Sequence, residues 1–179
     1  VSYSCNRAAT GWSRIYCPCN PRTKAFMRSI TLATLTAALL GTAAQAHYGM
    51  IIPSDPMLEQ DEGREIDLTL SFSHPFEDLG MTLDRPVSFG MTHDGTRTDL
   101  LDALTETEVM GEAGFSMTQR LERPGTYIFT MEPQPYWEPA EDAFIIHYTK
   151  TYVSAYGEDE GWDSELGLKT EIVPLSKPL

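Results

Sequence analysis

The residues of this sequence best suited to bind a metal ion are its four histidines, all of which follow Ala46. Every cysteine precedes Met27, so a transition-metal site in the later part of the chain must use imidazole, carboxylate or amine groups. His47 follows an Ala-Gln-Ala run that suits a signal-peptidase site. If cleavage falls there, its free α-amine and imidazole Nδ1 can close a chelate ring on one metal ion, as in copper histidine-brace proteins. If cleavage falls elsewhere, His47 merely begins a strand.

His74 is the second candidate ligand, in the stretch "SFSHPFEDLGM". Pro75 cannot donate to a sheet ladder, so the imidazole should lie at the end of a strand, where sites on β-sandwiches are usually found. Glu77 follows closely and either ligates the metal or accepts a hydrogen bond from a ligating imidazole. The alternative is a turn histidine beside a solvated acid.

The other two histidines carry weaker signals. His147, in "FIIHYTK", is predicted to lie mid-strand, on the same face of the strand as Ile145 and Thr149. A lone strand histidine is more often structural than a ligand, so the spacing alone favours a structural role. His93 lies in a His-Asp-Gly turn and is also interpreted as structural.

Aromatic side chains allow two interpretations, as plugs of the core or as a stacking platform for a sugar. They are Tyr136, Trp137 and Trp162. Nearby carboxylates supply a metal ligand or belong to a solvated loop, and these are Glu138, Glu141 and Asp142.

The first 46 residues are predicted to be absent from the working protein. Met27-Arg28-Ser29 is a short basic region, and the apolar run 30–40 and the small residues 41–46 complete a signal peptide over 27–46. Residues 1–26 have no clear pattern and are interpreted as an over-extended reading frame. We therefore expect one domain over 47–179, located in a bacterial periplasm and without disulfides.

The charge of the predicted domain is strongly negative. It holds eight basic and 26 acidic residues, a formal charge of −18. Such a surface repels nucleic acid and anionic lipid and attracts cations. The domain has no second apolar run, so we expect no direct membrane insertion.

Short alternating segments set the expected fold. "IDLTLSF" (66–72) alternates strictly, and 86–91, 114–121, 125–131 and 144–156 also have strand composition. Residues 99–109 fit a short helix or a bent strand. About seven short strands with turn signals between them predict an all-β fold, an immunoglobulin-like antiparallel β-sandwich.

Several motifs together resemble a known family. "AHYGMIIPS", "HPFE", "RPGTYIFTMEPQPYWEPAED", "FIIHYTK", "GWD" and "GLKTEIVPL" are similar to periplasmic proteins that form a domain-of-unknown-function family. Members are associated with cobalt or nickel ABC-type (energy-coupling-factor) transport. The resemblance covers 47–175 and implies a β-sandwich nickel uptake protein. It also implies metal ligands at His47, His74 and His147, and an inner-membrane metal transporter as partner.

Two functions follow as hypotheses. The first is a non-enzymatic periplasmic protein that captures Ni²⁺ (or Co²⁺) with His47, His74 and His147, completed by Glu77 or water, and delivers the ion to the transporter. The second is a copper histidine-brace protein, either a Cu²⁺ carrier or a polysaccharide-oxidising enzyme. A sandwich domain without metal is the remaining possibility. Nitrogen and oxygen ligands without thiolate suit Ni²⁺ or Cu²⁺, and intrinsic affinity favours Cu²⁺ over both Ni²⁺ and Co²⁺, so ligand type alone does not identify the metal.

Overall fold

A computed structural model describes residues 47–77, 79–139, 141–158 and 160–178. The two segments predicted to be removed or untranslated, 27–46 and 1–26, lie outside the described residues. The described residues include no helix that is both long and apolar enough to span a membrane.

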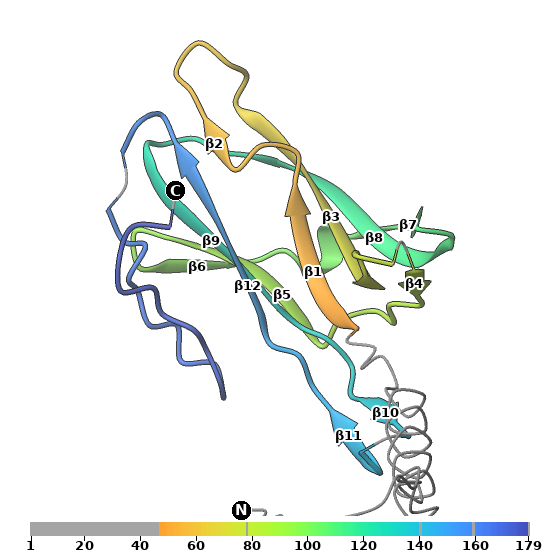
Figure 1. The fold of residues 1–179 in the computed structure, drawn as a ribbon. Coiled ribbons are helices and arrows are strands. Elements are labelled where there is room, and N and C mark those ends of the chain that lie inside the picture. Colours follow the sequence, from red (N-terminus) through yellow and green to blue (C-terminus); the bar gives the residue numbers. More distant parts are fainter. Residues whose placement is uncertain (1–46, 78, 140, 159, 179) are drawn as a thin grey trace, which may run out of the picture. The chain divides into compact units, whose positions relative to one another are not determined.

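Within the described residues, two five-stranded β-sheets form the sandwich (Figure 1). The first sheet has the order β1-β3-β8-β7, with β4 added to the end of β3, and all its pairs are antiparallel. Its strands are β1 (Tyr48–Pro53), β3 (Glu65–His74), β4 (Leu79–Met81), β7 (Thr105–Val109) and β8 (Glu112–Arg120). The second sheet has the order β2-β12-β9-β5-β6, in which only the short β2–β12 pair is parallel. Its strands are β2 (Met57–Leu58), β5 (Ser88–His93), β6 (Thr96–Asp99), β9 (Gly125–Glu132) and β12 (Thr149–Ala155).

The strand order is that of an immunoglobulin-like sandwich. The first sheet corresponds to strands A, B, E and D, and the second to strands G, F, C and C′. Tyr127, near the start of β9, also forms the tyrosine corner typical of these folds. Its hydroxyl donates to the carbonyl of Arg123 and accepts from the amide of the same residue, both at 2.9 Å. The predicted all-β sandwich is confirmed.

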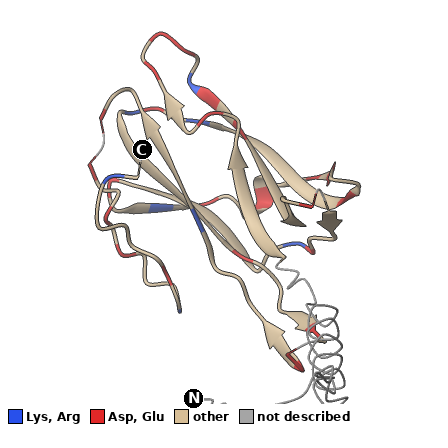
Figure 2. Ribbon diagram, viewed as in Figure 1, with Lys and Arg blue, Asp and Glu red and all other residues tan. Residues whose placement is uncertain are grey.

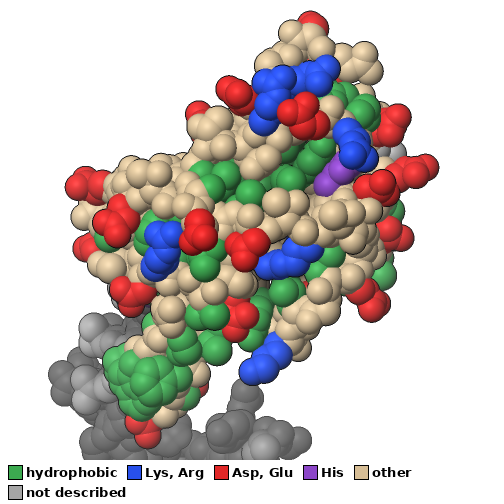
Figure 3. Space-filling view, turned by 180° about the vertical axis from the view of Figure 1, so that it is seen from behind, with side chains coloured by type: hydrophobic (Ala, Val, Ile, Leu, Met, Phe, Trp, Pro, Cys, Tyr) green, Lys and Arg blue, Asp and Glu red, His purple; other side chains and the backbone are tan. Residues whose placement is uncertain are grey.

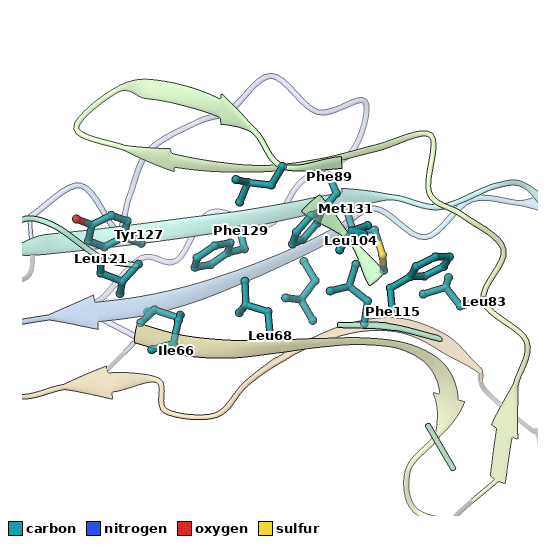
Figure 4. Close-up of a cluster of buried hydrophobic side chains, with 14 of the residues drawn as sticks. Ile66, Leu68, Leu83, Phe89, Leu104, Phe115, Leu121, Tyr127, Phe129 and Met131 are labelled. Carbon is teal, nitrogen blue, oxygen red and sulfur yellow. The ribbon is translucent and has the colours of Figure 1, made fainter. Parts of the chain in front are cut away.

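Alternation in β3 builds half of the core. Ile66, Leu68 and Leu70 point toward the second sheet and are at most 1% exposed. Side chains of β9 and β5 meet them from the other side, as Figure 4 shows for Phe129, Met131 and Phe89. Two-residue turns with positive φ connect β5 to β6 and β7 to β8, which matches the right-handed twist of the strands they join.

Two predicted elements differ from the structure. Residues 99–109 form a short 3₁₀-helix η1 (Leu101–Ala103) followed by β7. Residues 144–156 are not one strand, because β11 (Ala143–Ile145) ends before β12 begins at Thr149. β11 instead pairs with β10 (Tyr136–Glu138) in a separate two-stranded hairpin.

The C-terminal segment 160–178 has no regular secondary structure and is held by one buried ion pair. Lys150 Nζ on β12 donates to Glu171 Oε2 and to the carbonyl of Ser164, both at 2.9 Å. The side chains of Lys150 and Glu171 are only 6% and 13% exposed. The amides of Leu166 and Gly167 also donate to the Glu171 carboxylate. The Leu166 amide first, and then the Lys150 ammonium, lower the pKa of Glu171 from 4.5 to about 2.

Candidate metal centre

His47 and His74 face each other across neighbouring strands. β1 and β3 pair with Tyr48 opposite Ser73, so the next step of the register places His47 opposite His74. Residues directly opposite in an antiparallel pair point to the same face of the sheet. The two imidazole rings accordingly lie in contact, with centroids 5.8 Å apart and planes at 73°.

His74 has a buried nitrogen without a partner. It is the last residue of β3, as predicted from Pro75, and its side chain lies on the inner face with Leu70 and Phe72. The residue is 9% exposed, and its Nδ1 is buried without a hydrogen bond. The Glu77 carboxylate is nearby, with Oε2 4.0 Å from that nitrogen. Buried polar atoms are normally satisfied, so an orphaned Nδ1 fits a site where an ion or a water binds.

His147 lies in the break between β11 and β12, so the prediction that it is mid-strand is wrong. Its ring stacks on Tyr136 at 5.4 Å, and its Nε2 is 3.3 Å from the Tyr136 hydroxyl. Burial lowers the pKa of His147, which favours the neutral imidazole that a metal ion requires. Burial and the charge of Glu138 raise the pKa of Tyr136, so its phenol stays protonated.

The Phe72 ring lies between the His47–His74 pair and His147. Its ring centroid is 6.3 Å from that of His47, 5.9 Å from that of His147 and 4.9 Å from that of Tyr136. The structure therefore brings all three predicted histidine ligands to one end of the sandwich. His47, His74 and Glu77 form one group, and the Phe72 ring separates this group from His147. Over the described ranges, no three His, Cys, Asp or Glu side chains are already arranged around a single ion position.

A sequence model described as a domain of unknown function, DUF4198, matches residues 44–179. The chain belongs to this family. No curated protein matches the chain. The DUF4198 region includes His47, His74, Glu77 and His147, and with them the whole candidate centre.

The fourth histidine of the DUF4198 domain lies at the other end of the sandwich. The His93 ring stacks on Tyr127 at 4.0 Å, and its Nε2 is 3.0 Å from the carbonyl oxygen of Pro124. These contacts support the tyrosine corner and are consistent with the structural role expected of His93.

The aromatic residues singled out in the sequence do not form one face. Tyr136 packs between His147 and Phe72, which is the core role. Trp137 is 47% exposed and meets Phe144 edge-on at 5.1 Å across the β10–β11 hairpin. Trp162 belongs to the C-terminal segment of the DUF4198 domain and is half-buried.

The sequence reasoning missed Phe72 and the β10–β11 hairpin. Phe72 ends the alternating stretch 66–72, and its position two residues before His74 puts it on the same face of β3 as that ligand candidate. The hairpin has a sequence signal in hindsight, since two short aromatic runs flank the turn residues "PAED". It brings Tyr136 onto His147.

Proposed function

We propose that this domain is a periplasmic protein that captures Ni²⁺ (or Co²⁺) and delivers it to an inner-membrane uptake transporter, without catalysing a reaction. One observation carries the proposal. Three histidines that are far apart in sequence gather at one end of the sandwich, where the Nδ1 of His74 is buried without a hydrogen bond. The metal ion is the cargo of this function.

The backbone nitrogen of His47 is central to the proposed site. In the full chain this nitrogen belongs to an amide, whose delocalised lone pair makes it a poor ligand. Cleavage after Ala46 would turn it into an amine with a pKa of about 7.7–8.0. His47 would then offer two nitrogens beside His74, and the strand end would be free to adjust around an ion. Glu77 and His147 would complete the coordination.

The partner and the compartment come from other arguments. The signal peptide predicted over 27–46 supports export to the periplasm. The likeness to proteins of nickel and cobalt transport supports an energy-coupling-factor transporter as the recipient. The strongly acidic surface attracts cations and disfavours nucleic acid.

The test begins with the secreted protein and its intact mass, which establishes whether the chain begins at His47. Calorimetric titration with Ni²⁺ then compares this protein with His74→Ala and with a form carrying one alanine before His47. Both changes should weaken binding at least tenfold, whereas His93→Ala should bind as wild type does. A tight site held at 100 times its dissociation constant should also stabilise the fold by about 2.7 kcal/mol. Equal affinity with and without the extra alanine would refute the role of the amine.

Copper is the second candidate cargo, because an amine and neutral imidazoles suit Cu²⁺ and the order of intrinsic affinities favours it over Ni²⁺ and Co²⁺. Competition between the three ions, followed by metal analysis of protein purified from the periplasm, separates these cases. Reductant-dependent peroxide production by the copper-loaded protein would support a histidine-brace oxidase instead.

A further inference from the structure

Large apolar side chains are exposed around the end of the sandwich that carries the histidines. The Phe76 ring lies 6.3 Å from that of His74, and Leu79 pairs with His74 in the β3–β4 register. On the other loop, the Trp137–Phe144 pair adjoins Tyr136, which stacks on His147. We call these four residues the rim, and their exposed fractions are 88% for Phe76, 44% for Leu79, 47% for Trp137 and 69% for Phe144.

The β10–β11 hairpin has little support of its own. Each of its strands has three residues, and among the described residues they pair only with each other. A two-stranded hairpin of this size is at best marginally stable in water. The hairpin nevertheless presents an indole and a phenyl ring to solvent, and Figure 3 shows hydrophobic side chains gathered there in a lobe at the lower left. Exposed apolar patches rimmed by polar residues mark interaction sites.

The charge on the two loops that carry the rim has one sign, although Arg85 follows the first of them. The two loops that carry it, 75–84 and 133–148, contain no lysine or arginine. They contain six acidic residues, which are Glu77, Asp78, Asp84, Glu138, Glu141 and Asp142. Figure 2 shows the acidic colour on the β10–β11 hairpin, without any basic residue on it. This surface is complementary to an apolar socket bordered by basic side chains, and it is repelled by an anionic bilayer.

We propose that the rim is the surface through which this domain docks onto a membrane transporter, on a periplasmic protein face that is apolar and bordered by lysine or arginine. The identity of this partner rests on the proposed function. Trp137 and Phe144 are the anchors, because large aromatic side chains carry most of the energy of protein interfaces. Docking there would cover the histidine end and place the candidate metal centre next to the recipient.

The test uses the secreted protein and the energy-coupling-factor transporter of the same organism, reconstituted in nanodiscs of zwitterionic lipid. Binding is measured by biolayer interferometry for wild type and for Trp137→Ser/Phe144→Ser. The double variant should lose at least about 30-fold in affinity, the loss expected for a hot spot. Ile52→Ser/Met57→Ser removes two exposed apolar side chains away from the rim, 40% and 48% exposed, and should change affinity less than threefold.

Charge reversal and cross-linking give independent readouts. Glu141→Lys should weaken docking and reduce its dependence on salt, while Glu106→Lys on β7 should not. A photo-reactive phenylalanine at position 144 should cross-link to the transporter, and one at position 57 should not. Wild-type affinity in both the Trp137→Ser/Phe144→Ser and Glu141→Lys variants overturns the proposal. Equal binding to empty nanodiscs overturns it in favour of lipid, and rim-dependent self-association in solution overturns it in favour of a second copy.

Nickel titration of the same variants separates this proposal from the function on which it rests. Trp137→Ser/Phe144→Ser should bind Ni²⁺ as wild type does. If wild type binds Ni²⁺ while the rim variants bind the transporter as tightly as wild type does, only the proposed docking surface is wrong. If wild type binds no metal but docks through the rim, the interface stands and the cargo is wrong.

Discussion

Replacement of Glu171 by glutamine should detach the C-terminal segment from β12. The substitution keeps the size of the side chain but removes the charge that Lys150 and two backbone amides stabilise. The lowering of the Glu171 pKa from 4.5 to about 2 corresponds to about 3 kcal/mol of stability at pH 7, because each pKa unit is worth about 1.4 kcal/mol. Lys150, only 6% exposed, would also lose its counter-charge.

The pH dependence of this effect follows from the direction of the pKa shift. A carboxyl whose pKa is lower in the folded state stabilises the fold above its unfolded pKa, and the contribution disappears as the pH falls toward the folded value. The Glu171 carboxylate therefore contributes fully above about pH 5 and is half lost by pH 3, where about 1.5 kcal/mol remains.

Urea unfolding of wild type and Glu171→Gln at pH 7 and pH 3 measures both quantities. Glu165→Gln, an exposed acid on the same segment, is the matched control and should change stability by less than about 0.5 kcal/mol. A loss below about 1 kcal/mol at pH 7, or an equal loss at both pH values, would refute the reasoning. So would a carboxyl titration midpoint above pH 4 for Glu171, measured directly by carbon NMR.

Three further substitutions test the sandwich, each read from the free energy of unfolding in urea. Tyr127→Phe breaks the tyrosine corner and should cost about 1–3 kcal/mol, whereas Tyr148→Phe, which loses one part-buried hydrogen bond of 3.3 Å, should cost less. Gly114→Ala places a methyl group 2.6 Å from a carbonyl oxygen of β3 and should destabilise strongly, while Gly63→Ala meets nothing within 4 Å and should be neutral. Leu68→Ala empties a fully buried position and should cost about 2–5 kcal/mol. The packing described is contradicted if a substitution and its control lose the same stability, or if Leu68→Ala leaves the free energy of unfolding unchanged.

The fold was predictable where a single strand decides its own structure. The strict alternation of 66–72 correctly predicts β3, and the end of that strand at His74 follows from Pro75. The tyrosine corner could not be read from spacing, because it depends on the path of the chain before β9.

The break at His147 was not predictable from its own residues. β-branched and aromatic side chains continue through 144–156, but the last ladder pair joins Thr149 to Met131. Beyond this pair, the chain that leaves the neighbouring strand β9 enters "PQP", where Pro133 and Pro135 have no backbone N–H to donate. The start of β12 is therefore determined by the sequence that follows the neighbouring strand β9.

The residues of the candidate centre could be predicted from the sequence, but their arrangement in space could not. The register that places His47 opposite His74 involves two strands, and the contacts of the Phe72 ring with His47 and His147 join β3 to two other segments of the chain. No property of the individual histidine motifs contains this information.

The strands that follow His47 and His147, which are β1 and β12, belong to different sheets and are joined by contacts of long sequence separation. Thr149 and Thr151 on β12 donate to the carbonyls of Gly49 and Ile51 on β1, each across 100 residues. Contacts of such long range close slowly, because the chain entropy of the large loop is lost before they form. A folding chain would therefore bring His147 to His47 and His74 only after β12 has docked on β1. Under the proposed function, full metal affinity would therefore report that folding is complete, and a partly folded chain would bind the ion more weakly.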